Sequence, residues 1–147
     1  MMGHLILRVT IKILFAPILL YALYVQFHGD YGPGGGFQAG VILASAFILH
    51  ALGFGLKRCQ RVIPPSWLPV GMALGVLIYA GVGLYTMLLG ANFLDYDIIQ
   101  PDSHHHAGQH IGIIAVELGV GLAVAATMLQ IFYAFAGREP EPSDDAW

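Results

Sequence analysis

The sequence predicts an all-α integral membrane protein with four transmembrane helices. Three observations favour this fold class: 57% of the 147 residues are apolar, only 10% are charged, and the mean hydropathy is +0.72. A soluble domain of this composition would expose large apolar patches to water. A spanning helix needs about 20 apolar residues, and the apolar stretches of this chain leave little sequence over for a soluble domain.

Each predicted span is an apolar stretch with at most two charged residues. The first has positive charge before its apolar run, like a signal peptide, but it is long enough to span and no small-residue cleavage site follows it. The second and third contain no Asp, Glu, Lys or Arg, which makes them typical membrane helices. The four predicted spans are residues 5–27, 37–56, 68–90 and 111–136.

The loop charges predict the orientation. All Lys and Arg residues fall on the N-terminal side, in the second loop or after the last span, whereas the first and third loops contain Asp and no Lys or Arg. Because basic residues near span ends stay in the cytoplasm, we expect both termini inside the cell. Loop 57–67 is then inside and loops 28–36 and 91–110 are outside a plasma membrane. One membrane domain, residues 1–137, precedes a short acidic tail, residues 138–147.

Charge and cysteine content argue against several function classes. The net charge of −3 and the pI of about 6.1 give no electrostatic basis for binding nucleic acid. The single cysteine, Cys59, cannot form an internal disulfide and has no CxxC partner, which is typical of an inert thiol. No nucleophile–base pair can be assembled, so we expect neither an enzyme nor a cofactor.

The third loop contains a run of histidines. On a helix extended back from residue 111, His106 and His110 would lie one turn apart, a spacing that suits a metal. No acidic or cysteine ligand accompanies them at a recognisable interval, so we predict no metal site. The rest of the run is His104 and His105.

Small residues recur at four-residue steps on three of the predicted spans. Helices in lipid associate where small residues let backbones approach closely. A bundle of four helices needs few such faces, so we interpret the surplus as contact with other membrane subunits; tight packing within one bundle is the alternative. The stripes are Gly36-Gly40-Ala44, Gly71-Gly75 and Ala115-Gly119-Ala123, with Gly121 beside the last.

Two segments resemble a known family. Residues 30–37, DYGPGGGF, followed by GVILAS at 40–45, are similar to the signature of the B subunit of Mrp-type sodium/proton antiporters. Residues 116–124, VELGVGLAV, resemble the last span of that family. The glycine motif carries over to this chain as Pro33, Gly34, Gly35, Gly36 and Phe37, and we interpret it as a turn that allows close helix packing.

The resemblance implies a small membrane subunit of a multisubunit antiporter that exchanges cytoplasmic sodium ions for external protons. It implies other membrane subunits as partners, and it places the large ion channels in those subunits. A subunit of a related membrane-bound hydrogenase-like complex remains an alternative. A stand-alone small exporter is another, although such exporters carry their carboxylate in the first span, where this chain has a lysine.

Four residues are candidates for an ion or proton path. Glu117 is the only acidic residue inside a predicted span, and a carboxylate in hydrocarbon costs several kcal/mol unless it is protonated or partnered. It is either a relay or a bridge between helices, for example to Thr86, Tyr85 or a neighbouring subunit. His110 lies seven residues earlier on the same face and extends a possible route outward.

The other two candidates lie in the first and second spans. His50 is either a hydrogen-bonding core residue or a relay. Lys12 is about 10 Å from the end of its span, so its stem can carry the ammonium towards the interface. We expect Lys12 and Glu117 to lie at different depths and not to pair.

Overall fold

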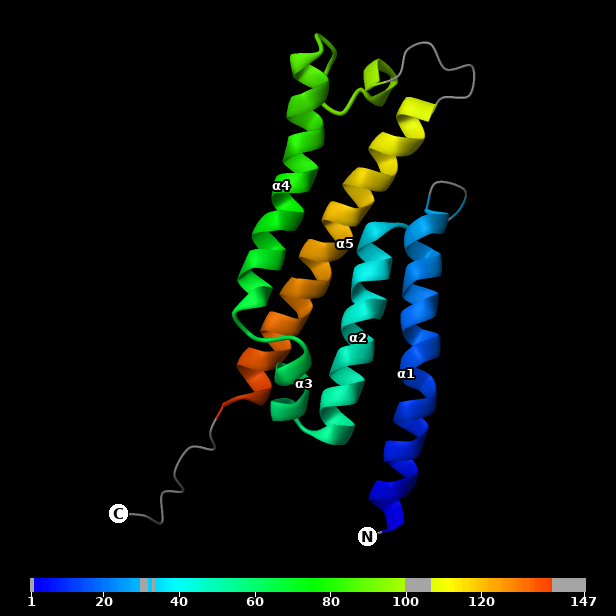
Figure 1. Cartoon of the computed structure of the whole chain (residues 1–147), viewed down its shortest axis with the longest axis vertical. Coiled ribbons are helices and arrows are strands. Elements are labelled where there is room, and N and C mark those ends of the chain that lie inside the picture. The colour runs from blue at the N-terminus through cyan, green and yellow to red at the C-terminus, as the bar shows by residue number, and fades with distance from the viewer. Residues whose placement is uncertain (1, 30–31, 33, 100–106, 139–147) are drawn as a thin grey trace, which may run out of the picture.

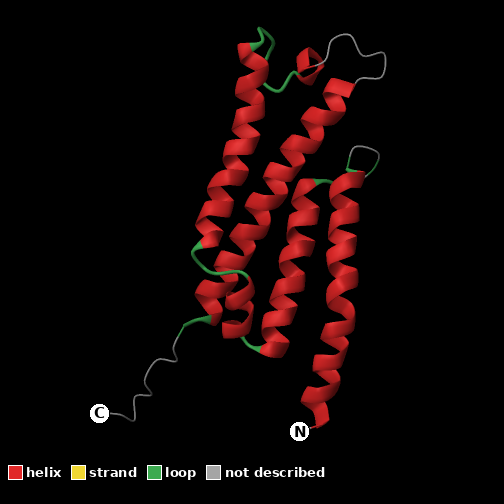
Figure 2. Ribbon diagram, in the orientation of Figure 1, coloured by secondary structure: helices red, strands yellow, loops and turns green. Residues whose placement is uncertain are grey.

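The computed structural model describes residues 2–29, 32, 34–99 and 107–138. Within these residues the chain is helical and contains no strand (Figure 2). Four helices are long and apolar enough to cross a membrane, which confirms the predicted fold class. They are α1 (Met2–His28), α2 (Gly36–Phe54), α4 (Trp67–Leu88) and α5 (Ala107–Ala136).

Two details differ from the sequence-based expectation. The last span begins at Ala107 rather than at residue 111, so more of the third loop is helical than expected. The second loop is not a plain connection, because it contains the short helix α3 (Leu56–Val62). A single 3₁₀ turn, η1 (Tyr96–Ile99), follows α4.

The four long helices form a single row in the order α1, α2, α5, α4 (Figure 1). Each helix packs extensively on its neighbour in this row, and α1 makes only a minor contact with α5. In Figure 1 α1 and α4 therefore lie at opposite edges of the molecule. The arrangement is an open layer rather than a closed four-helix bundle.

The sequence of α5 explains the row. Successive residues of a helix are about 100° apart, so positions two apart lie about 200° apart, on opposite faces. A Cβ atom on Gly119 would lie 2.8 Å from the carbonyl oxygen of Gly75 in α4. A Cβ atom on Gly40 of α2 would lie 2.6 Å from the carbonyl oxygen of Gly121. Because Gly119 and Gly121 face opposite ways, α5 is held between α4 and α2.

These contacts correct the interpretation of the small-residue stripes. The glycine stripes of α2 and α4 pack against α5, and the Gly119 stripe of α5 packs against α4, all within the chain. They are internal seams, and reading them as surfaces for other subunits is wrong. The surfaces left for lipid or partners are the two broad faces and the edges of the row, where Leu20, Leu77 and Leu88 are exposed.

The α3 end of the layer is closed by a buried cluster. Cys59 of α3 is completely buried. The hydroxyl of Tyr133, near the end of α5, donates to the carbonyl oxygen of Ile63 at 3.2 Å and lies 3.3 Å from the sulfur of Cys59. The α2–α3–α4 connection is thereby fastened to α5.

The opposite end of the layer is stepped. The end of α1 and the start of α2 lie well below the far ends of α4 and α5 (Figure 1). Residues 29–35 connect these two helix ends, and we call this segment the glycine turn. Above that step, the loop after α4 packs on the two longer helices: the Phe93 ring lies against Gly83 and the Tyr96 ring against Gly112. The hydroxyl of Thr86 fixes this loop. It lies within hydrogen-bond distance of the carbonyl oxygens of Gly83 (2.9 Å) and Asn92 (3.0 Å) and accepts from the N–H of Leu94 at 3.0 Å.

Candidate ion-binding site

Because α1 and α2 meet partway along α5, Glu117 of α5 contacts the glycine turn. Glu117 lies ten residues into α5, about 15 Å along its axis, at the level where α2 begins. Its carboxyl group packs against Gly29 at the end of α1 and against Gly35, where a Cβ atom would lie 2.7 Å from Oε1. The backbone of Glu117 packs directly on Gly36. Two features that are more than 80 residues apart in the sequence therefore form one site.

The glycines are required by this geometry. Gly35 has φ +105°, a conformation that residues with a side chain rarely adopt. Its N–H donates to the carbonyl oxygen of Val25 in α1 at 3.3 Å, which closes the turn. Side chains at Gly29, Gly35 or Gly36 would occupy the space of Glu117.

The other residues of the glycine motif have different surroundings. A Cβ atom on Gly34 would lie 3.3 Å from the carbonyl oxygen of Val25, so this glycine serves the turn rather than the carboxyl. Phe37 is 64% exposed and lies on the surface of the layer. Pro33 lies outside the described residues.

The start of α2 supplies a favourable field for a carboxylate. A helix N-terminus carries a partial positive charge and backbone N–H groups without intrahelical partners. Gly35 is the N-cap of α2 and provides no side-chain cap, and the Glu117 carboxyl lies against it. The dipole of α2 therefore opposes the desolvation that disfavours the ionised carboxyl.

The remaining candidates divide between the two ends of the layer. His110 lies on the same face of α5 as Glu117, about 10 Å nearer the start of the helix. The imidazole of His50 instead stacks on Phe54, with ring centroids 4.9 Å apart, and lies 5.5 Å from the ring of Phe15. His50 is thus about 21 Å along α2 from the glycine turn.

Lys12 belongs to the same end as His50. Its ammonium nitrogen lies 5.9 Å from the ring centroid of Phe54, the last residue of α2. The guanidinium of Arg58 lies at the same distance from that ring. Lys12 and Glu117 are therefore at opposite ends of α2 and form no pair.

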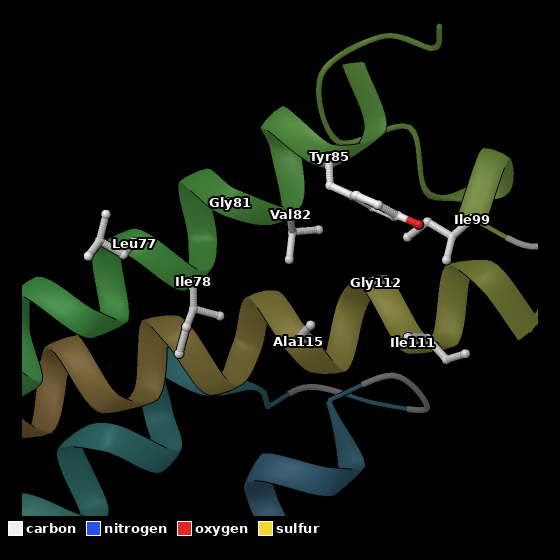
Figure 3. Close-up of a pocket in the computed structure, with 9 residues that line it drawn as sticks. All are labelled: Leu77, Ile78, Gly81, Val82, Tyr85, Ile99, Ile111, Gly112 and Ala115. Atoms are coloured by element: carbon white, nitrogen blue, oxygen red, sulfur yellow. The ribbon is translucent and has the colours of Figure 1, made fainter. Parts of the chain in front are cut away.

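The suggested bridges from Glu117 to α4 are wrong. The hydroxyl of Thr86 is engaged in the loop after α4, and α4 packs on the other face of α5. Tyr85 lines a separate cavity of about 340 Å³ between α4 and α5, where its side chain reaches towards Ile99 (Figure 3). The other lining residues of that cavity are apolar, so it offers no ion site.

No group of three or more metal-ligating side chains occurs within residues 2–29, 32, 34–99 and 107–138. The run from His104 to His106 lies outside these residues.

Sequence reasoning missed Gln26. This residue of α1 is only 7% exposed, and its side-chain Oε1 lies 2.7 Å from where a Cβ atom on Gly121 would be. Gly121 is one helical turn from Glu117, and Gln26 is nearly one turn from Gly29. The available signal was a glutamine inside an apolar span, three residues before a glycine.

Comparisons with known proteins match most of the chain. The family model described as "Domain related to MnhB subunit of Na+/H+ antiporter" matches residues 6–130. A protein of Staphylococcus haemolyticus (strain JCSC1435) named "Putative antiporter subunit mnhB2" is 32% identical over 137 residues, which cover 90% of this chain and 94% of the relative. Its namesake in Staphylococcus aureus (strain Newman) is 31% identical over the same coverage. The chain therefore belongs to the MnhB family of Na⁺/H⁺ antiporter subunits.

Proposed function

We propose that this chain is a small plasma-membrane subunit of a multisubunit Na⁺/H⁺ antiporter in which Glu117 and the glycine turn bind a proton or sodium ion on the transport path. The family supports a transporter subunit with other membrane subunits as partners. The contact of the Glu117 carboxyl with Gly35 at the start of α2 carries the assignment of the site. Ionisable groups inside membrane proteins commonly mark ion paths.

The shape of the layer supports the subunit role. A transporter that works alone needs a path enclosed by its own helices, and a single row of helices encloses none. Large apolar residues lie along the whole length of α1 and α4. We expect lipid and larger subunits to cover these surfaces and to complete the path past Glu117.

Isolation of the complex tests the subunit role. A tagged copy expressed in its native setting is expected to co-purify with several larger membrane proteins, and its deletion is expected to abolish Na⁺-driven proton movement in everted vesicles. The purified chain alone, reconstituted in liposomes, should show no cation-dependent pH change. Robust transport by the chain alone would contradict the proposal and favour a stand-alone exporter.

We also propose that the glycine turn and the loop after α4 face the outside, with α3 in the cytoplasm. The bias of Lys and Arg towards the α3 end supports this orientation. In a Cys59→Ala background, Asp97→Cys is expected to react with an impermeant thiol reagent on intact cells, because Asp97 is exposed. Lys57→Cys, also exposed, should react only in everted vesicles. The reverse pattern would invert the topology.

A further inference from the structure

An open pocket between α1, α2 and α5 contains a buried polar group without a hydrogen-bond partner among the described residues. The side-chain nitrogen of Gln26 is buried and has no hydrogen-bond partner in the described part of the chain. A buried amide without a partner costs roughly 1–3 kcal/mol, so most such groups in native proteins are satisfied by protein or by ordered water. Gln26 therefore indicates a ligand.

The cavity next to this amide is large enough for several small molecules. Its volume is about 180 Å³, and a water molecule occupies about 30 Å³ in the liquid. The walls come from α1, α2 and α5 and are apolar except for Gln26. They are Ala22, Leu23, Gln26, Ala39, Gly40, Leu43, Leu118, Gly121 and Leu122.

The chemistry of the walls selects water as the occupant. A sodium ion needs several oxygen ligands, whereas the only polar side chain in these walls is one carboxamide whose nitrogen is a donor. An acyl chain cannot accept the amide hydrogens. Water accepts from the amide nitrogen and donates to the amide oxygen, so it satisfies either orientation of the group.

The pocket lies close to the carboxyl site on two helices. On α5, Gly121 lines the pocket and is one turn from Glu117. On α1, Gln26 lines the pocket and lies three residues before Gly29, which contacts the carboxyl. We propose that ordered water molecules occupy this pocket, bound by Gln26, and hydrate Glu117. This inference rests on the proposed role of Glu117.

A structure of the assembled complex at a resolution that shows water tests the site directly. Water density within hydrogen-bond distance of the Gln26 amide supports it. A side chain of a partner subunit or a lipid tail in the cavity overturns it.

Variants of Gln26 test what the water does. Gln26→Leu keeps the volume but removes the amide, and we expect antiport about three- to tenfold slower in the assembled complex, with a shifted pH profile. The infrared carbonyl band of protonated Glu117 should also shift and exchange with deuterium more slowly. Gln26→Asn should retain most activity, because an additional water can bridge the shorter side chain. The matched control is Gln38→Leu, since Gln38 is exposed.

The outcomes separate this inference from the proposed function. If Glu117→Gln is inactive but Gln26→Leu has a normal rate, pH profile and infrared band, the water cluster is wrong and the carboxyl site stands. If water density lies on Gln26 but Glu117→Gln is fully active, the transport role of the carboxyl is wrong and the water site stands as structural hydration.

Discussion

Replacing Glu117 with glutamine is expected to lower the antiport rate about 100-fold while the complex assembles normally. Glutamine preserves the shape of the side chain and its packing against the glycine turn, but it cannot take up or release a proton. Removing a group that transfers protons typically costs 10²- to 10⁴-fold in rate. The measurement is cation-driven pH change in everted vesicles, normalised to the amount of assembled complex.

Two further variants separate an ion-binding role from a structural bridge. Glu117→Asp keeps the carboxyl and should retain part of the activity with an altered pH profile. Glu117→Ala removes both the proton site and the packing against Gly29 and Gly35, so it should also reduce assembly. A Glu117→Gln complex with full activity across the pH range, together with a damaging alanine, would show that the carboxyl only joins helices.

Replacing Gly35 with alanine is expected to destabilise the subunit by about 2–6 kcal/mol, the sum of two costs. A side chain at φ +105° strains the backbone by roughly 1–3 kcal/mol. The added Cβ atom would also lie 2.7 Å from Oε1 of Glu117, and overpacking of this kind costs about 1–3 kcal/mol. The thermal stability of the purified complex and the yield of assembled subunit measure the effect.

Gly55 provides the matched control for the cost of backbone strain. It has φ +95° but no atom within 4 Å of a Cβ position, so Gly55→Ala should show the strain alone. In the Glu117→Ala background, Gly35→Ala should lose most of the overlap cost, because the carboxyl it meets is absent. Equal losses at Gly35 and Gly55 would show that the carboxyl does not pack on the turn.

The spans were predictable because lipid imposes a simple condition on sequence. A helix that crosses hydrocarbon needs a long apolar stretch, and all four predicted stretches are helical in the structure. The short helix α3 was missed because seven residues with three basic side chains resemble a polar loop. The two-residue offset between Gly119 and Gly121 predicts two contact faces on α5, but the sequence does not say that α4 and α2 occupy them; the expectation assigned the surplus faces to other subunits.

The contact between Glu117 and the glycine turn could not be predicted from either segment. Each was recognisable by itself, one as a carboxyl in a span and the other as a glycine motif. Their meeting depends on how far α1 and α2 are displaced along α5, which is set by interlocking glycines such as Gly36 and Gly40 over the whole seam. The expected contacts of Glu117 with Thr86 and Tyr85 were therefore wrong, and Gln26 was overlooked for the same reason.

Because the four helices form a single row, the subunit is only one helix thick between its two broad faces. One helix with its side chains is about 10–12 Å across, so nothing in the seam between α2 and α5 is farther than that from either broad face. Two different neighbours, one on each side, would thus both be within a few water molecules of the same carboxyl. A subunit built this way would leave one carboxyl within reach of neighbours on both of its broad faces.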